Sequence, residues 1–192
     1  MKSKKLIIFL FIIFISKSKG QEIFNNSLEL KPLLVFNNGF AGGEFLAYGM
    51  GIEYSRTITK KIQGSLFLGK GEINGWNTNA FALESHEKGT LGYTQLNLNI
   101  DYLIVNTDKV KIFTGLSFML SQFNIVALQI KSNDRIDVRQ VSQKNFSNYL
   151  LHIKMENKLG AKTYWTSQFN YQPYFIDANE VLMAKTGIGI RF

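Results

Sequence analysis

Four titratable side chains occupy every second position of one segment: His152, Lys154, Glu156 and Lys158. Residues two apart in a strand point to the same face, so this spacing gathers an imidazole, two ammonium groups and a carboxylate in one row. Such a row could bind an anion or gate a pore. The alternative is an ion-pair network with charged residues of other polar strand faces, namely Glu53, Asp101, Lys185 and Arg191. We favour this luminal polar network, because a buried charge without a partner is costly.

The remaining candidates for chemistry are weak. The run Ser85-His86-Glu87 contains side-chain types of a hydrolase triad, but triad partners meet through the fold and rarely adjoin in sequence. Without Cys, and with no pair of His at ligand spacing, we predict no metal site. The glycine-rich stretch 39–43 lacks the strand-then-helix context of a phosphate loop, so we expect a flexible first loop there. We therefore predict no catalytic site and no cofactor.

Period-two alternation shows which elements must position the polar row. In the stretch 93–102, Leu96, Leu98 and Ile100 share one face, and Asn97, Asn99 and Asp101 share the other. The same pattern, strong or weak, predicts eight strands. They span about residues 27–36, 48–58, 62–72, 91–104, 110–124, 148–159, 163–174 and 181–192.

The connections between these strands alternate in length. Long gaps at 37–47, 73–90, 125–147 and 175–180 alternate with short gaps at 59–61, 105–109 and 160–162. An up-and-down meander places all the long gaps at one end, as in a barrel whose two ends face different compartments. The gap at 125–147 has two interpretations. It is either a disordered loop or a hairpin that extends the flanking strands, with its tip at 131–135.

The first twenty residues have the layout of a secretory signal peptide. Lys2, Lys4 and Lys5 precede an apolar run of ten residues from Leu6 to Ile15, which is too short to span a bilayer. We expect residues 1–20 to be removed and residues 21–192 to form one domain. This domain holds 17 basic and 14 acidic residues, and its net charge of +3 gives little reason to expect nucleic-acid binding.

Alternation alone does not decide between a soluble barrel with an apolar interior and a membrane barrel with an apolar exterior. The polar faces carry charges that can pair with one another, interspersed with Gly and Ser that suit a narrow lumen. Aromatic residues occur toward strand ends on the apolar faces, where membrane barrels place their interface girdles. These predicted interface aromatics are Tyr48, Tyr54, Tyr102, Trp165 and Tyr171. Together these features favour the membrane barrel over the soluble one.

The last strand ends on Phe192, with Ile188 and Ile190 on the same face. This ending resembles the C-terminal signature of bacterial outer-membrane barrels, whose terminal aromatic residue is read by the assembly machinery. In size and layout the chain resembles the OmpA/OmpX-like and PorT-type barrel families. The resemblance implies an eight-stranded antiparallel up-and-down transmembrane β-barrel in the outer membrane, with extracellular long loops and Phe192 as its assembly signal.

No family-specific binding or catalytic motif accompanies this resemblance. We therefore expect a non-enzymatic integral membrane protein with a structural or surface-interaction role through its long loops. The alternatives are a barrel subunit of a larger outer-membrane secretion or assembly complex, and a lipid A-modifying enzyme that uses His86 or His152. The expected partners are outer-membrane lipid, the barrel assembly machinery during insertion, and other outer-membrane proteins.

Overall fold

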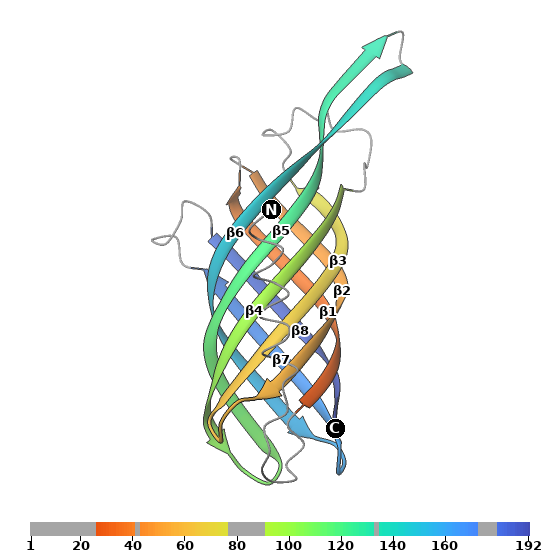
Figure 1. Ribbon diagram of the computed structural model, residues 1–192. Coiled ribbons are helices and arrows are strands. Elements are labelled where there is room, and N and C mark those ends of the chain that lie inside the picture. The colour runs from red at the N-terminus through yellow and green to blue at the C-terminus, as the bar shows by residue number, and fades with distance from the viewer. Residues whose placement is uncertain (1–25, 41–42, 77–90, 133–134, 173–179) are drawn as a thin grey trace, which may run out of the picture.

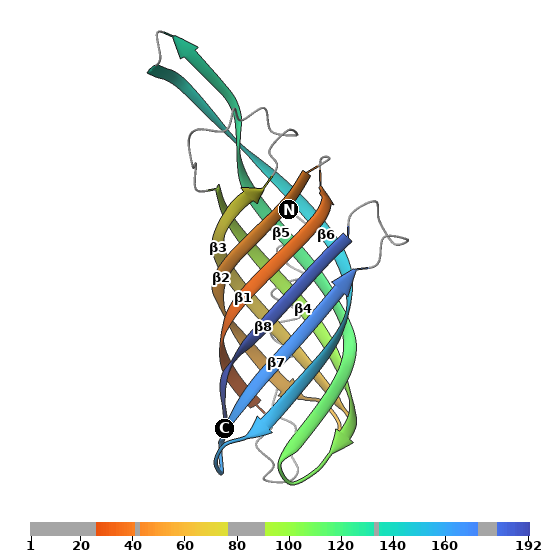
Figure 2. The same cartoon turned by 180° about the vertical axis from the view of Figure 1, so that it is seen from behind.

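The computed structural model describes residues 26–40, 43–76, 91–132, 135–172 and 180–192. This part of the chain forms eight antiparallel strands that pair in chain order and close into a barrel (Figures 1 and 2). The strands are β1 Asn26–Phe40, β2 Gly43–Thr57, β3 Ile62–Trp76, β4 Leu91–Asn106, β5 Val110–Ser132, β6 Arg135–Lys158, β7 Thr163–Gln172 and β8 Glu180–Arg191. The predicted fold is therefore confirmed. No helix in the described residues is long and apolar enough to cross a membrane.

The two faces of the barrel wall differ sharply in polarity. Along β1, Leu28, Leu30 and Leu34 are exposed on the outside, whereas Glu29 and Lys31 are buried inside. The same alternation continues through β6 and β8, where polar and charged residues again face the lumen. A soluble barrel would reverse these faces, so this arrangement fits a barrel surrounded by lipid.

The barrel closes where β1 pairs with β8. The register runs from Ser27 opposite Arg191 to Asn38 opposite Glu180. At the end of this seam the backbone of Asn26 exchanges two hydrogen bonds with that of Phe192, at 3.2 and 2.9 Å. Neither terminal strand is thus left as an open edge, and closure satisfies backbone groups that would find no partner in lipid.

The two ends of the barrel differ. One end, the short-turn end, carries the turns at 58–61, 107–109 and 159–162 together with Phe192; it is the lower end in Figure 1. At the opposite end, the hairpin end, two gaps predicted to be long loops are largely strand. Residues 37–40 belong to β1 and residues 43–47 to β2, so the prediction of a flexible first loop was wrong for residues 39, 40 and 43, while 41–42 lie outside the described residues. Pairing across the hairpin outweighs the flexibility of the glycines, with a register shift between Asn38 and Phe40.

The segment 125–147 is a hairpin rather than a disordered loop. Strands β5 and β6 pair continuously from Val110 opposite Asn157 to Ser132 opposite Arg135. Figure 1 shows this two-stranded ribbon extending well beyond the rest of the hairpin end. The predicted signal peptide and His86 lie outside the described residues.

Candidate functional site in the barrel lumen

A cluster of charged side chains fills the lumen in the half of the barrel nearer the short-turn end. Glu29 and Lys31 come from β1, Glu53 from β2, Lys154 from β6 and Lys185 from β8. All five side chains are fully buried in the ion pairs they form. They meet because each stands at a position whose side chain points into the lumen. The registers between the strands also place them at a similar level along the barrel axis.

Two carboxylates share two lysines at the centre of this cluster. Lys31 Nζ lies 2.6 Å from Glu29 Oε2 and 2.9 Å from Glu53 Oε1. Lys154 Nζ lies 2.9 Å from Glu29 Oε1 and 3.4 Å from Glu53 Oε1. Each ammonium group therefore bridges both carboxylates, which holds like charges together in an interior without bulk water.

Lys185 is held more loosely than the other two lysines. Its Nζ lies 3.5 Å from Glu53 Oε2 and donates no hydrogen bond within the described residues. The same atom lies 4.4 Å from the centre of the Phe67 ring, a cation–π arrangement. Gly51 and Gly69 leave room for that ring, since a Cβ at either position would come within 3 Å of its atoms.

Tyr164 and Glu156 extend the network toward the short-turn end. Tyr164 donates a hydrogen bond of 2.7 Å from its hydroxyl to Glu29 Oε1. Glu156 pairs with Lys154 at 3.3 Å and with the guanidinium of Arg191, which also stacks 4.3 Å from the Tyr164 ring centre. Arg191 is the least buried member of the network, with 21% of its side chain exposed.

His152 of β6 and Asp101 of β4 form another buried pair, through His152 Nε2 and Asp101 Oδ1. Gly115 lies between their strands in the register, opposite both residues. A Cβ at Gly115 would lie 2.8 Å from His152 Nε2, so the imidazole occupies space that only glycine leaves open. In this position, with Asp101 against its ring, His152 is part of the luminal packing.

Uncharged polar groups occupy the lumen beyond the charged cluster. Asn99 donates to Ser65 Oγ at 2.8 Å and accepts from Ser117. Asn148 donates to Gln172 Oε1 at 2.6 Å, nearer the hairpin end. These bonds tie neighbouring strands together and fill the interior. An eight-stranded barrel has room for little more than such side chains.

The chemistry available in this lumen is limited. The buried carboxylates are Glu29, Glu53, Asp101 and Glu156, and the cations that face them are Lys31, Lys154, Lys185 and Arg191. These charges are paired with one another. Among the described residues, no group of three or more His, Cys, Asp or Glu side chains could hold a metal ion. The arrangement therefore acts as a packed polar plug that joins β1, β2, β6 and β8.

The structure places six of the eight residues predicted for the luminal network fully inside. They are Glu53, Asp101, His152, Lys154, Glu156 and Lys185. Arg191 lies at the mouth of the lumen, and Lys158 does not belong to the network. Lys158 is exposed because it ends β6, where the strand leaves the barrel wall.

Sequence reasoning missed Glu29, Lys31 and Tyr164. The signal was present in β1, where Glu29 and Lys31 alternate with Leu28 and Leu30. It was masked because the inward positions farther along β1, Leu33 and Val35, are apolar like the outward ones. Tyr164 gave no such signal, since aromatic residues occur on both faces of the barrel wall.

The five predicted interface aromatics all lie on the outward face of the wall. Near the hairpin end, Tyr48 donates a hydrogen bond of 3.0 Å to Glu72 on the neighbouring strand. Near the short-turn end, Tyr54 donates to Asn26 at 2.8 Å. Trp165 bonds to Ser167 at 3.2 Å, and Tyr102 and Tyr171 complete the set. Each ring thus combines an apolar body with a polar handle, the combination favoured at membrane–water interfaces.

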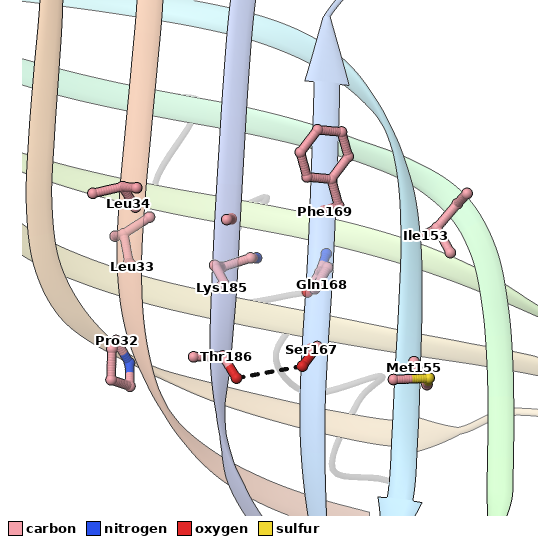
Figure 3. A pocket seen from close by; sticks show the side chains of 11 residues that line it. Pro32, Leu33, Leu34, Ile153, Met155, Ser167, Gln168, Phe169, Lys185 and Thr186 are labelled. Carbon is pink, nitrogen blue, oxygen red and sulfur yellow. Dashed lines mark hydrogen bonds between the residues drawn. The ribbon is translucent and has the colours of Figure 1, made fainter.

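A groove of about 750 Å³ runs over the outside of the wall across β6, β7, β8 and β1 (Figure 3). Its floor contains the small residues Ser167, Ala184 and Thr186, with the two hydroxyl groups 3.3 Å apart. Exposed apolar side chains, including Phe169 and Ile153, stand beside it. The groove is therefore a shallow, apolar depression on the face that meets lipid.

No family model and no curated protein matches this chain, but solved structures do. Neisserial surface protein A (NspA) aligns with a TM-score of 0.57 and 8% identity over 87% of this chain and 97% of that chain. Ail, the attachment invasion locus protein of Yersinia pestis in complex with the heparin analogue sucrose octasulfate, aligns with a TM-score of 0.55 and 9% identity over 88% of this chain and 97% of that chain. The outer membrane protein AlkL in DMPC bilayers aligns with a TM-score of 0.56 and 12% identity over 92% of this chain and 94% of that chain.

The fold is that of the small bacterial outer-membrane β-barrels. This fold accounts for the inverted polarity of the wall. Lipid covers the apolar outside, and the lumen collects the polar and charged residues. The similarity extends over most of each chain but at very low sequence identity, so it concerns the backbone architecture alone. No functional residue can be transferred from one protein to another on this basis.

Proposed function

We propose that this protein is a non-enzymatic integral outer-membrane barrel that presents the β5–β6 hairpin as an interaction surface outside the cell. The observation that supports this proposal is the length of the hairpin. Pairing between β4 and β5 ends at Phe123, and pairing between β6 and β7 ends at Leu151. Between these points, β5 and β6 pair with each other and with no other described strand.

The hairpin therefore has two long strand edges whose backbone groups are unpaired within the described residues. Such an edge is a template for an added strand, and several recognition modules bind extended peptides in this way. The partner class that fits best is an extended polypeptide segment. The names of NspA, a surface protein, and Ail, an attachment invasion protein, are consistent with a surface role for barrels of this fold.

Orientation is the first part of this proposal to test. The chain contains no Cys, so Ser132→Cys at the hairpin and Asp108→Cys at the short-turn end give two single labelling sites. A membrane-impermeant maleimide should label position 132 on intact cells and position 108 only after permeabilisation. The reverse pattern would contradict the proposed orientation.

The interaction itself is tested with a photo-crosslinking residue at Gln129 in the hairpin, and the same probe at Lys60 as the control. We expect adducts with other proteins from position 129 in intact cells and none of the same size from position 60. In a second variant, Asn-Gly replaces residues 126–141, so that Ile125 and Ser142 flank a two-residue hairpin turn. This shortened variant should still show heat-modifiable migration. When it is expressed together with the position-129 protein, it should not reduce the yield of the position-129 adducts. Correctly inserted protein that gives no adduct from position 129 would contradict the proposal.

A second candidate role is that of a subunit in a larger outer-membrane complex. The groove over β6, β7, β8 and β1 favours this role, because small residues allow a partner to approach the wall closely. Ala184→Leu would fill the groove, and Leu116→Ile on the outward face of β5 is the matched control. Loss of a co-purifying outer-membrane protein only with Ala184→Leu would support the subunit role.

A lipid A-modifying activity has less support. His152 is buried against Asp101, away from the lipid-facing surface, and His86 lies outside the described residues. Replacing each histidine with Gln tests this role directly. An altered lipid A composition in either variant, with the barrel still inserted, would restore the enzymatic interpretation.

A further inference from the structure

The short-turn end carries an unusual concentration of exposed basic side chains. They are Lys60 and Lys61 in the first turn, Lys109 in the second, and Lys158 and Lys162 around the third. Among the described residues of these turns, Asp108 is the one acidic side chain. By sequence, the segments at the opposite end are mixed: 77–90, 124–147 and 173–180 together hold five basic and six acidic residues. The positive charge is therefore concentrated at one rim of the barrel.

Each of the three turns also exposes a large aliphatic side chain beside its lysines. Ile58 is 60% exposed, Ile104 near the second turn 55%, and Leu159 62%. Phe192 adds an exposed ring where β8 and β1 meet. Apolar and basic groups thus occur together at this rim, the composition of surfaces that lie at the boundary between hydrocarbon and head groups.

The turns hold these side chains on an ordered backbone. Thr59 Oγ1 accepts hydrogen bonds from the backbone of Lys61 at 3.3 Å and Ile62 at 3.1 Å. Thr107 Oγ1 accepts from the backbone of Val110 at 2.9 Å. The backbone N–H of Lys158 donates to the carbonyl of Lys109 at 2.8 Å, which brings the second and third turns together. The lysines therefore start from fixed points around the rim.

We propose that this rim binds the phosphate groups of anionic phospholipids in the leaflet that it faces. The exposed aliphatic side chains place the rim at the hydrocarbon boundary, and lysine stems extend from there to the head groups. Each basic residue near an anionic surface contributes about 1 kcal/mol, or roughly fivefold in affinity. Lys109 and Lys158, on neighbouring turns, form the pair best placed to hold one phosphate between them.

Trp165 is a built-in reporter for this site. It lies on the outward face, opposite Asn157 on β6 and therefore one residue from the level of Lys158. The chain has two Trp, so Trp76→Phe leaves Trp165 as the one indole. We would fold this variant into phosphatidylcholine vesicles and compare quenching by brominated phosphatidylglycerol with quenching by brominated phosphatidylcholine.

We expect a several-fold preference for phosphatidylglycerol at Trp165, weakened by salt. The double substitution Lys109→Gln and Lys158→Gln should remove most of the preference. Lys70→Gln, which removes an exposed charge from β3 away from this rim, should leave it unchanged. Equal quenching by the two lipids in the starting protein, or an unchanged preference in the double variant, would overturn the proposal.

A soluble anion is the alternative source of phosphate. In vesicles of phosphatidylcholine alone, neither inorganic phosphate nor polyphosphate should bind with an affinity that depends on Lys109 and Lys158. Polyphosphate binding that is lost in the double variant, together with no preference for phosphatidylglycerol, would assign the rim to a soluble polyanion and overturn the lipid assignment.

Discussion

Lys154 Nζ lies 2.9 Å from Glu29 Oε1, although 125 positions separate the two residues in the chain. The contact crosses the lumen from β6 to β1. It exists because β1 closes the barrel and brings its inward face toward that of β6. The same lysine also reaches Glu53 and Glu156, which makes it the most connected cation in the lumen.

We predict that Lys154→Met destabilises the barrel by about 3–5 kcal/mol, since it leaves Glu29 and Glu53 with less compensation in a buried site. Lys185→Met should cost clearly less, because Lys185 contacts a carboxylate only at 3.5 Å. Lys60→Met on the exposed rim is the control. Urea unfolding in vesicles of phosphatidylcholine alone gives the three free energies. A cost for Lys154→Met no larger than that for Lys60→Met would contradict the network's stabilising role.

The space beside Gly189 yields a prediction about packing. A Cβ there would lie 2.3 Å from Tyr164 Cζ, and the three nearest atoms all belong to the Tyr164 side chain. Gly189→Ala should therefore destabilise the barrel by about 1–3 kcal/mol. Tyr164→Leu should also destabilise it, through loss of the hydrogen bond to Glu29.

Combining Gly189→Ala with Tyr164→Leu should cost less than the sum of the single changes, because the shorter side chain removes the clash. Unfolding free energies of the two single variants and the double variant complete the cycle. Strict additivity would show that the Tyr164 ring does not limit the space at Gly189.

The packed lumen predicts the absence of an open pore. Buried ion pairs and the Phe67 and Tyr164 rings occupy the interior at the level of the charged cluster. In planar bilayers we expect no steady porin-like conductance. Replacing both rings, as Phe67→Ala with Tyr164→Ala, should create measurable ion leakage if the barrel still shows heat-modifiable migration. A sustained conductance from the unaltered protein would contradict the plugged lumen.

The terminal aromatic residue yields a prediction that separates folding from assembly. The two hydrogen bonds that join Phe192 and Asn26 are between backbone atoms, so Phe192→Ala keeps them. Folding of the purified variant into vesicles should therefore stay nearly unchanged. Insertion into the outer membrane of cells should fall if the assembly machinery reads the ring. Quantifying the heat-modifiable species in each setting tests this, and equal insertion in cells would remove Phe192 as an assembly signal.

Much of the architecture is encoded locally in this sequence. The alternation of Leu98, Ile100 and Tyr102 with Asn97, Asn99 and Asp101 predicts a strand with two chemically different faces. Its period of two residues depends only on the backbone geometry of a strand. The short gaps at 59–61, 105–109 and 160–162 likewise predict tight turns. Strand number and direction could therefore be predicted from the sequence.

Two features could be decided only by the tertiary structure. Residues 37–40 and 125–132 extend their strands because partners across each hairpin supply backbone hydrogen bonds, which no local propensity specifies. The luminal network also depends on closure. Glu29 and Lys31 show the alternation of a strand, but their contacts with Lys154 and Glu53 follow from strand register around the barrel. Local sequence determined which side chains face inward, and long-range pairing decided which of them meet.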